Sequence, residues 1–230
     1  MKPQHHLDPA TLVSYAAGAM TGAMAVVAAA HLEACEHCRQ VLAEAERLGG
    51  VLLDQQAPRA DELARAAALR EHMLSRIGAA KSGVATSGTR IVDAALRTCA
   101  DNIGDTLPRA LHPYFGTSLH RLKWRWIAPG MHFMHARNVS HGKLFMLKIA
   151  PGKSMPTHGH HGNELTQVLQ GAYDDGLGHF AVGDMADLDA DIRHQPITAS
   201  GPPCICVAAL DAPLHFPGWF ARALQPLVGL

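Results

Sequence analysis

Apolar residues recur at helical spacing through the first third of the chain, between residues that commonly start and end helices. Asp8 and Pro9 form a typical start, an N-cap acid followed by proline at the first helical position, and Gly18 can end that helix. In the fourth expected helix the apolar side chains form a single stripe, as in an amphipathic helix. The other helices are expected over residues 21–30, 36–48 and 61–77, the last two ending at Gly49-Gly50 and Gly78.

The pattern changes after residue 78. Segments such as Lys-Ser-Gly and Asn-Ile-Gly-Asp punctuate the stretch up to residue 109 and are typical of a connection, with room for a short helix near 91–99. Beyond it, short apolar runs alternate with Pro-Gly and Gly turns, which is the pattern of a β-sandwich or barrel. Strands are expected over residues 124–127, 131–139, 143–149, 164–169 and 204–210, followed by a closing helix over 217–227.

These patterns predict an α+β protein with more than one domain. A four-helix domain is expected over residues 1–80, a linker over 81–109, and an all-β barrel domain over 110–230. A chain of 230 residues suffices for two small domains, and 48% hydrophobic residues suffice for packed cores.

Composition argues against two classes of protein and draws attention to metals. Lys+Arg and Asp+Glu both number 20, so the formal net charge is zero. A nucleic-acid-binding protein needs a basic face, and a disordered chain usually combines low hydrophobicity with high net charge. The chain also contains 16 histidines, and histidine is the commonest metal ligand. We therefore expect metal sites rather than direct contact with nucleic acid.

The cysteines and the N-terminal residues predict a soluble cytoplasmic protein. The five cysteines are odd in number and too few for the disulfide framework of a small secreted domain, which favours metal-binding or redox thiols in a reducing compartment. The N-terminal residues lack the apolar core of a signal peptide. The most apolar early stretch, residues 16–30, is too short and too weakly apolar to span a bilayer, so no membrane association is expected.

The first candidate metal site has the spacing H-x3-C-x2-C and comprises His31, Cys35 and Cys38. Residues four apart on a helix share a face, and a C-x2-C step places two thiolates around a turn at the tetrahedral spacing that zinc prefers. The fourth ligand is missing from the motif, and His5 and His6 both lie upstream. A site closed by four protein ligands is structural rather than catalytic.

The second candidate metal site comprises His158, His160, Glu164 and His194. Residues two apart in a strand share a face, so the first two imidazoles can point to the same ion, and Glu164 follows after a short turn. His194 can supply the fourth ligand from a distant strand. Three imidazoles and a carboxylate suit zinc, iron, manganese or nickel, so the ligand types alone do not select the metal.

Both motifs resemble known families. The N-terminal histidines with the H-x3-C-x2-C motif resemble the zinc-binding anti-sigma domain over residues 1–80, and this resemblance implies His6 as the fourth zinc ligand, with His5 as the alternative. The stretch from Gly152 to Gly171 resembles the first cupin motif in full. The second cupin motif is kept only in part, because the usual proline and glycine before its histidine are replaced by Asp189 and Asp191.

The combination of the two motifs resembles the ChrR-type anti-sigma factors over nearly the whole chain. That resemblance implies one zinc ion in each domain. It also implies a one-to-one complex with an extracytoplasmic-function sigma factor, which the helical domain keeps from RNA polymerase. In that family the cupin-like domain is needed to sense singlet oxygen or organic peroxide stress. The chain would then be a negative regulator of transcription in a stress response, and not an enzyme.

Cys204 and Cys206 lie on one face of an expected strand and are candidate redox-sensing thiols. The competing interpretation is that both are small buried core residues, as free cysteines often are. The competing function for the whole chain is a metal-dependent cupin enzyme, such as a dioxygenase or isomerase, with an accessory zinc module. Such an enzyme needs an open coordination position, which four protein ligands bound at once would remove.

Overall fold

The computed structural model describes residues 2–57, 60–81 and 105–215. The chain divides into two compact units. One unit joins the residues up to Arg47 with those from Thr106 onward, and the other spans Leu48–Asp105. The expected helix near 91–99, the closing helix over 217–227 and most of the expected linker lie outside the described residues.

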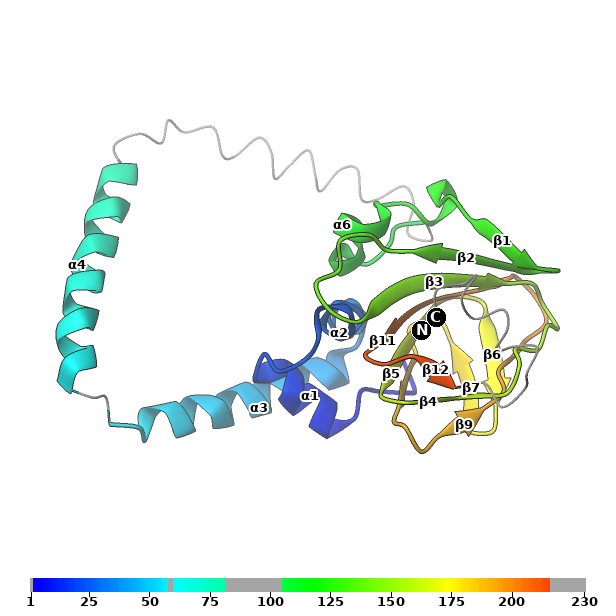
Figure 1. The fold of residues 1–230 in the computed structure, drawn as a ribbon, viewed down its shortest axis with the longest axis horizontal. Coiled ribbons are helices and arrows are strands. Elements are labelled where there is room, and N and C mark those ends of the chain that lie inside the picture. Colours follow the sequence, from blue (N-terminus) through cyan, green and yellow to red (C-terminus); the bar gives the residue numbers. More distant parts are fainter. Residues whose placement is uncertain (1, 58–59, 82–104, 216–230) are drawn as a thin grey trace. The chain divides into compact units, whose positions relative to one another are not determined.

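Four helices occupy the N-terminal part of the chain, as predicted, and are labelled in Figure 1. Asp8 caps the first helix through its Oδ1, which accepts the N–H of Ala10 at 2.8 Å. The expected ends at Gly49-Gly50 and Gly78 are wrong, because both helices continue through these glycines. Glycine costs a helix only about 1 kcal/mol relative to alanine, and none of the three adopts the left-handed backbone that ends a helix. The helices are α1 (Pro9–Ala16), α2 (Gly22–Ala34), α3 (Glu36–Asp54) and α4 (Ala60–Lys81).

A short irregular segment precedes the strands and packs on α2. It contains η1 (Arg109–Leu111), α6 (His112–Phe115) and η2 (Leu119–Arg121). The Glu33 carboxylate near the end of α2 accepts the backbone N–H groups of Arg109 and Ala110 at 2.9 and 2.8 Å. The last residues of the expected linker are therefore anchored to the helical part of the same unit.

The β part of the chain is a cupin-like arrangement of three antiparallel sheets. One sheet has six strands in the order β1-β2-β3-β11-β5-β8, and two smaller sheets have the orders β10-β6-β7 and β12-β4-β9. The expected closed barrel is therefore corrected to three sheets around a common interior (Figure 1). The strands are β1 (Arg125–Ala128), β2 (Met131–His135), β3 (Lys143–Ile149), β4 (His158–His160), β5 (Glu164–Gln170), β6 (Ala172–Asp175), β7 (Gly178–Ala181), β8 (Met185–Leu188), β9 (Arg193–His194), β10 (Ile197–Thr198), β11 (Cys204–Leu210) and β12 (Leu214–His215).

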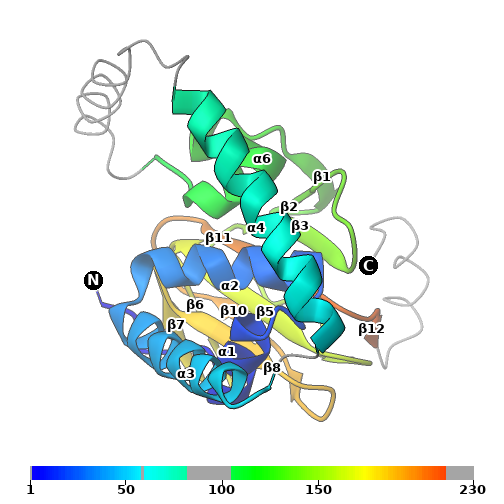
Figure 2. The same cartoon turned by 90° about the vertical axis from the view of Figure 1, so that its left-hand side faces the viewer.

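The helix α2 packs on the outer face of the six-stranded sheet, as Figure 2 shows. Val27 and Ala30 of α2 share one buried cluster with Leu165 of β5 and with Val207 and Ala209 of β11. All five side chains are fully or almost fully buried. The helices α1 to α3 therefore do not form a core of their own, but share one with the sheet.

The alternate residues of the same strands face the interior. Cys206 and Ala208 of β11 belong to a second buried cluster with Phe145 and Leu147 of β3. Because β11 is covered on both faces, every residue in it is buried, which explains its uninterrupted apolar sequence. Among the described residues, no helix is both long and apolar enough to cross a membrane.

Candidate metal centres

The first cluster gathers four donor atoms from the N-terminal segment and from the break between α2 and α3. Cys35 leaves the helical conformation (φ −103°, ψ 107°), so α2 ends and α3 begins around the cluster. His6 Nδ1 lies 3.2 Å from Cys35 Sγ, and His31 Nε2 lies 3.3 Å from Cys38 Sγ. One ligand atom from each of the four residues lies within 4.8 Å of the others. We refer to His6, His31, Cys35 and Cys38 as the first centre.

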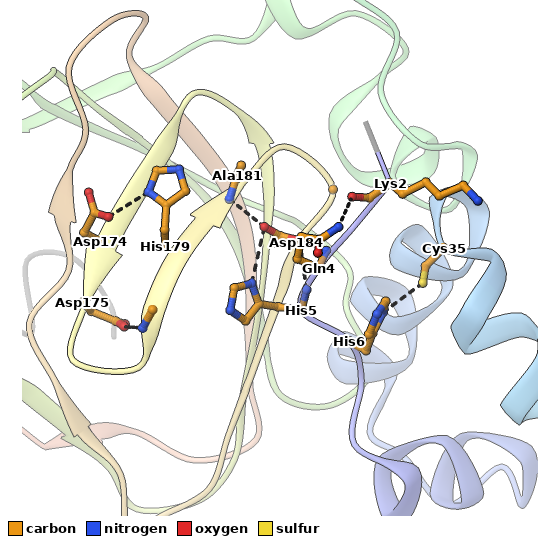
Figure 3. A network of polar contacts seen from close by, with 12 residues as sticks. Lys2, Gln4, His5, His6, Cys35, Asp174, Asp175, His179, Ala181 and Asp184 are labelled. Carbon is orange, nitrogen blue, oxygen red and sulfur yellow. Dashed lines mark hydrogen bonds and ion pairs between the residues drawn. The ribbon is translucent and has the colours of Figure 1, made fainter.

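The structure distinguishes the two N-terminal histidines that the sequence could not separate. His6 points to Cys35 and lies near Cys38, whereas His5 points away from them (Figure 3). The His5 ring stacks on Phe180 with centroids 4.2 Å apart. His5 Nδ1 lies 3.5 Å from Asp184 Oδ2. His5 therefore contacts the β part of the unit and is not one of the four clustered donors.

Burial prepares the first centre for a cation. It lowers the pKa of His31 to about 4, so the imidazole is neutral and its lone pair is available at neutral pH. Burial also raises the pKa of the Cys38 thiol to about 11, which keeps the proton on sulfur until a cation replaces it. Two imidazoles and two sulfurs at tetrahedral spacing are a donor set that suits zinc.

The second cluster lies in the interior of the β part. His158 of β4 is directly opposite His194 of β9, and their Nε2 atoms are 3.0 Å apart. His160 Nδ1 lies 3.3 Å from Glu164 Oε2 at the start of β5. All four residues are buried, and one ligand atom from each lies within 4.8 Å of the others. We refer to His158, His160, Glu164 and His194 as the second centre.

The second centre contains a buried polar group that a cation would satisfy. Neither ring nitrogen of His160 makes a hydrogen bond, although the residue is only 5% exposed. Nε2 has no polar partner, and the 3.3 Å contact of Nδ1 with Glu164 Oε2 lacks hydrogen-bond geometry. Burial lowers the pKa of His160 and of His158, so both rings are neutral. An unsatisfied buried polar group costs about 1–3 kcal/mol, and a bound metal ion would offset that cost. The donors therefore fit a metal that accepts nitrogen and oxygen ligands.

Contacts behind the ligands orient the second centre. His194 Nδ1 pairs with Asp175 Oδ2 at 3.0 Å, and His158 Nδ1 pairs with the carbonyl oxygen of Pro156 at 2.9 Å. The Thr166 hydroxyl donates to Glu164 Oε1 at 2.8 Å. Partners of this kind fix the tautomer and direction of a ligand. None of these three contacts was predicted from the sequence. The sequence around Asp175 in particular has the composition of an ordinary turn, where aspartate is common.

A small cavity of about 50 Å³ adjoins the second centre. Its lining is mostly apolar and includes His158, Glu164 and His194 together with Cys204 and Cys206. Burial raises the pKa of the Cys204 thiol to about 12 and that of Cys206 well above its ordinary value. The two thiols therefore face the same small space as the metal ligands, in their protonated and unreactive form.

Comparison with known proteins shows one family over both parts of the chain. A family model described as the ChrR cupin-like domain matches residues 114–212. The anti-sigma-E factor ChrR of Cereibacter sphaeroides is 34% identical over 226 residues, which cover 98% of each chain. A chain in the crystal structure of Rhodobacter sphaeroides SigE in complex with the anti-sigma ChrR is also similar. That match has a TM-score of 0.67 and 30% identity, and covers 91% of this chain and 100% of that chain.

Proposed function

Because the chain belongs to the ChrR family of anti-sigma factors, we propose that it binds an extracytoplasmic-function sigma factor one-to-one and withholds it from RNA polymerase. The observation that carries the proposal is 34% identity to a named anti-sigma factor over 98% of both chains. The same relationship implies that the chain is a regulator rather than an enzyme. We place it in the cytoplasm, where the sigma factor acts.

We assign binding, connection and sensing to three segments of the chain. Residues 1–80 form the sigma-binding domain, residues 81–109 the linker and residues 110–230 the sensor domain. The family match at residues 114–212 lies within the third segment and supports its start near residue 110. Apolar side chains on the second half of α3 and on α4 are exposed, which supports a partner surface there. They are Leu48, Val51, Leu52, Leu53, Leu69, Met73, Leu74 and Ile77.

Each centre holds one zinc ion in this proposal. His6, His31, Cys35 and Cys38 bind the first, and His158, His160, Glu164 and His194 bind the second. Zinc supplies a closed tetrahedral crosslink at the first centre, where it joins the N-terminal segment to the α2–α3 break. The second donor set contains no sulfur and also suits iron, manganese or nickel, so its ligand types alone do not select zinc.

Release of the sigma factor begins at the second centre. Singlet oxygen or an organic peroxide would attack the ligands there or the thiols of Cys204 and Cys206. The shared cavity supports this route, since it brings the thiols and three of the ligands to one small space. The raised thiol pKa values imply that the interior must open before either cysteine reacts as a thiolate.

Co-expression with the cognate extracytoplasmic-function sigma factor, found by screening those of the same genome, tests the proposal. The wild-type chain should co-purify with that sigma factor in equal amounts. A Cys35→Ala, Cys38→Ala variant should lose both the first metal ion and the partner. The matched control is Cys204→Ala, Cys206→Ala, which removes two buried thiols but keeps the first centre and should still bind. Failure of the wild-type chain to bind would contradict the proposed function.

A further inference from the structure

One carboxylate of the β part holds the N-terminal segment just before the ligand His6. Asp184 follows β7 and is only 3% exposed. Its Oδ1 accepts the backbone N–H groups of Gln4 and His5, and its Oδ2 accepts that of Ala181 at 2.8 Å (Figure 3). Burial alone would raise the pKa of Asp184, but these backbone hydrogen bonds together lower it. The ionised carboxylate therefore fixes the main chain on which His6 sits.

The residue before Asp184 orients a second ligand of the same centre. The carbonyl oxygen of Gly183 lies 3.0 Å from His31 Nδ1. This contact assigns the proton to Nδ1 and leaves Nε2 free to face Cys38. The four donors of the first centre lie in the first 38 residues, yet both of its imidazoles are positioned by the turn between β7 and β8.

The turn that joins β6 to β7, at the opposite end of β7 from Asp184, orients a ligand of the second centre. The Asp175 side chain is fully buried, and its Oδ2 pairs with His194 Nδ1 at 3.0 Å. Its Oδ1 accepts the backbone N–H groups of Leu177 and Gly178 at 2.8 and 3.2 Å. One carboxylate therefore ties the direction of His194 to the conformation of the β6–β7 turn.

That turn touches the segment of the first centre directly. A Cβ atom added at Gly178, whose φ is +152°, would lie 3.1 Å from His5 Nε2. The His5 ring also stacks on Phe180, which stacks in turn on Tyr173 with centroids 4.9 Å apart. Tyr173 lines the cavity beside the second centre. The β6–β7 turn held by Asp175 thus lies next to His5, and the stack of His5, Phe180 and Tyr173 runs from the residue preceding His6 to the cavity beside the second centre.

We propose that the segment Asp175–Asp184 couples the two metal centres. Gly183 and Asp184 are positioning residues for His31 and His6, and Asp175 is a positioning residue for His194. The inference rests on the metal sites of the proposed function and adds the element through which a change at the second centre reaches the first. Because coupling between binding sites is reciprocal, each metal ion should then alter the affinity of the other centre.

Cobalt(II) reports the first centre alone, because only its donor set contains sulfur and gives a thiolate-to-cobalt charge-transfer band. We would load the full chain with cobalt, add excess chelator and follow the loss of that band. Asp184→Asn places an amide NH2 where one oxygen now accepts an N–H group, and should speed the loss by about 10–100-fold, the usual effect of removing a contact behind a ligand. The matched control is Asp174→Asn on the same hairpin. Its side chain is 58% exposed and pairs with His179, so the loss should be unchanged.

Two variants test the coupling without touching a first-centre ligand. Asp175→Asn should speed loss of the thiolate band by about fivefold, the lower end of typical coupling between sites. Gly178→Ala keeps both carboxylates but strains the β6–β7 turn, because φ is +152°, and brings a Cβ to 3.1 Å from His5 Nε2. It should therefore also speed the loss, even where Asp184→Asn fails to fold. If both variants match Asp174→Asn, the coupling is overturned. If the wild-type chain shows no band, the metal assignment of the proposed function is overturned instead.

Discussion

His160 provides a test of the second centre in which one substitution has opposite effects with and without metal. Its imidazole is 5% exposed, and neither nitrogen makes a hydrogen bond. Leucine has a similar volume and no polar atoms. Because an unsatisfied buried polar group costs about 1–3 kcal/mol, His160→Leu should stabilise the metal-free chain by about 1–2 kcal/mol.

With metal present, His160→Leu should instead destabilise the chain. A ligand at about 1,000 times its Kd stabilises the folded state by about 4 kcal/mol, and a centre that has lost one of four ligands should lose most of that gain. Urea unfolding, followed by tryptophan fluorescence, measures both conditions in the β part, where Trp124 and Trp126 lie at and just before β1. The matched control is His161→Leu at the adjacent exposed position, which should shift neither midpoint appreciably. Destabilisation by His160→Leu in both zinc and chelator would refute the reasoning.

Two further predictions concern the interior of the β part and its contact with α2. Burial raises the pKa of Cys204 to about 12 and that of Cys206 well above its ordinary value, so only about one in ten thousand Cys204 thiols is ionised at pH 8. Alkylation of both cysteines in the native chain should therefore be slow and should rise about tenfold per pH unit up to pH 10. Fast, pH-independent alkylation measured by mass spectrometry would show that these thiols are not buried. Leu165→Ala should lower the free energy of unfolding by about 2–5 kcal/mol, because this fully buried side chain belongs to the core that α2 and the sheet share. The helix and the sheet should still unfold in a single transition. Helix loss measured by circular dichroism at a different urea concentration from the fluorescence change would contradict a shared core.

The sequence predicted the parts of the fold that depend on local spacing. The long strands β3, β5 and β11 and the four helices follow from apolar periodicity, and the start at Asp8-Pro9 follows from capping. Among the strands of two to four residues the apolar pattern revealed only β1, because so short a segment has little measurable period. It also misplaced the ends of α3 and α4, since an internal glycine weakens a helix without ending it.

The metal centres show the same contrast between features set by local spacing and features set by long-range packing. Spacing within the motifs identified the donor groups that the structure brings together, because helical and strand geometry decide which neighbours share a face. The choice between His5 and His6 and the role of Asp184 depend on contacts across about 180 residues of sequence. Such contacts arise from packing of the N-terminal segment on the β6–β7 hairpin, and no local pattern records them. The closed barrel expected for the β part was corrected for the same reason, since pairing between distant strands decides how the sheets close.

Native mass spectrometry of the chain co-expressed with its cognate sigma factor tests the central claim most directly, because it counts the protein partners and the metal ions together. The account predicts one complex that contains one copy of each protein and two zinc ions. The Cys35→Ala, Cys38→Ala variant should give a free chain with one metal ion. A wild-type chain detected as a monomer with two zinc ions, together with free sigma factor, would contradict the proposed function.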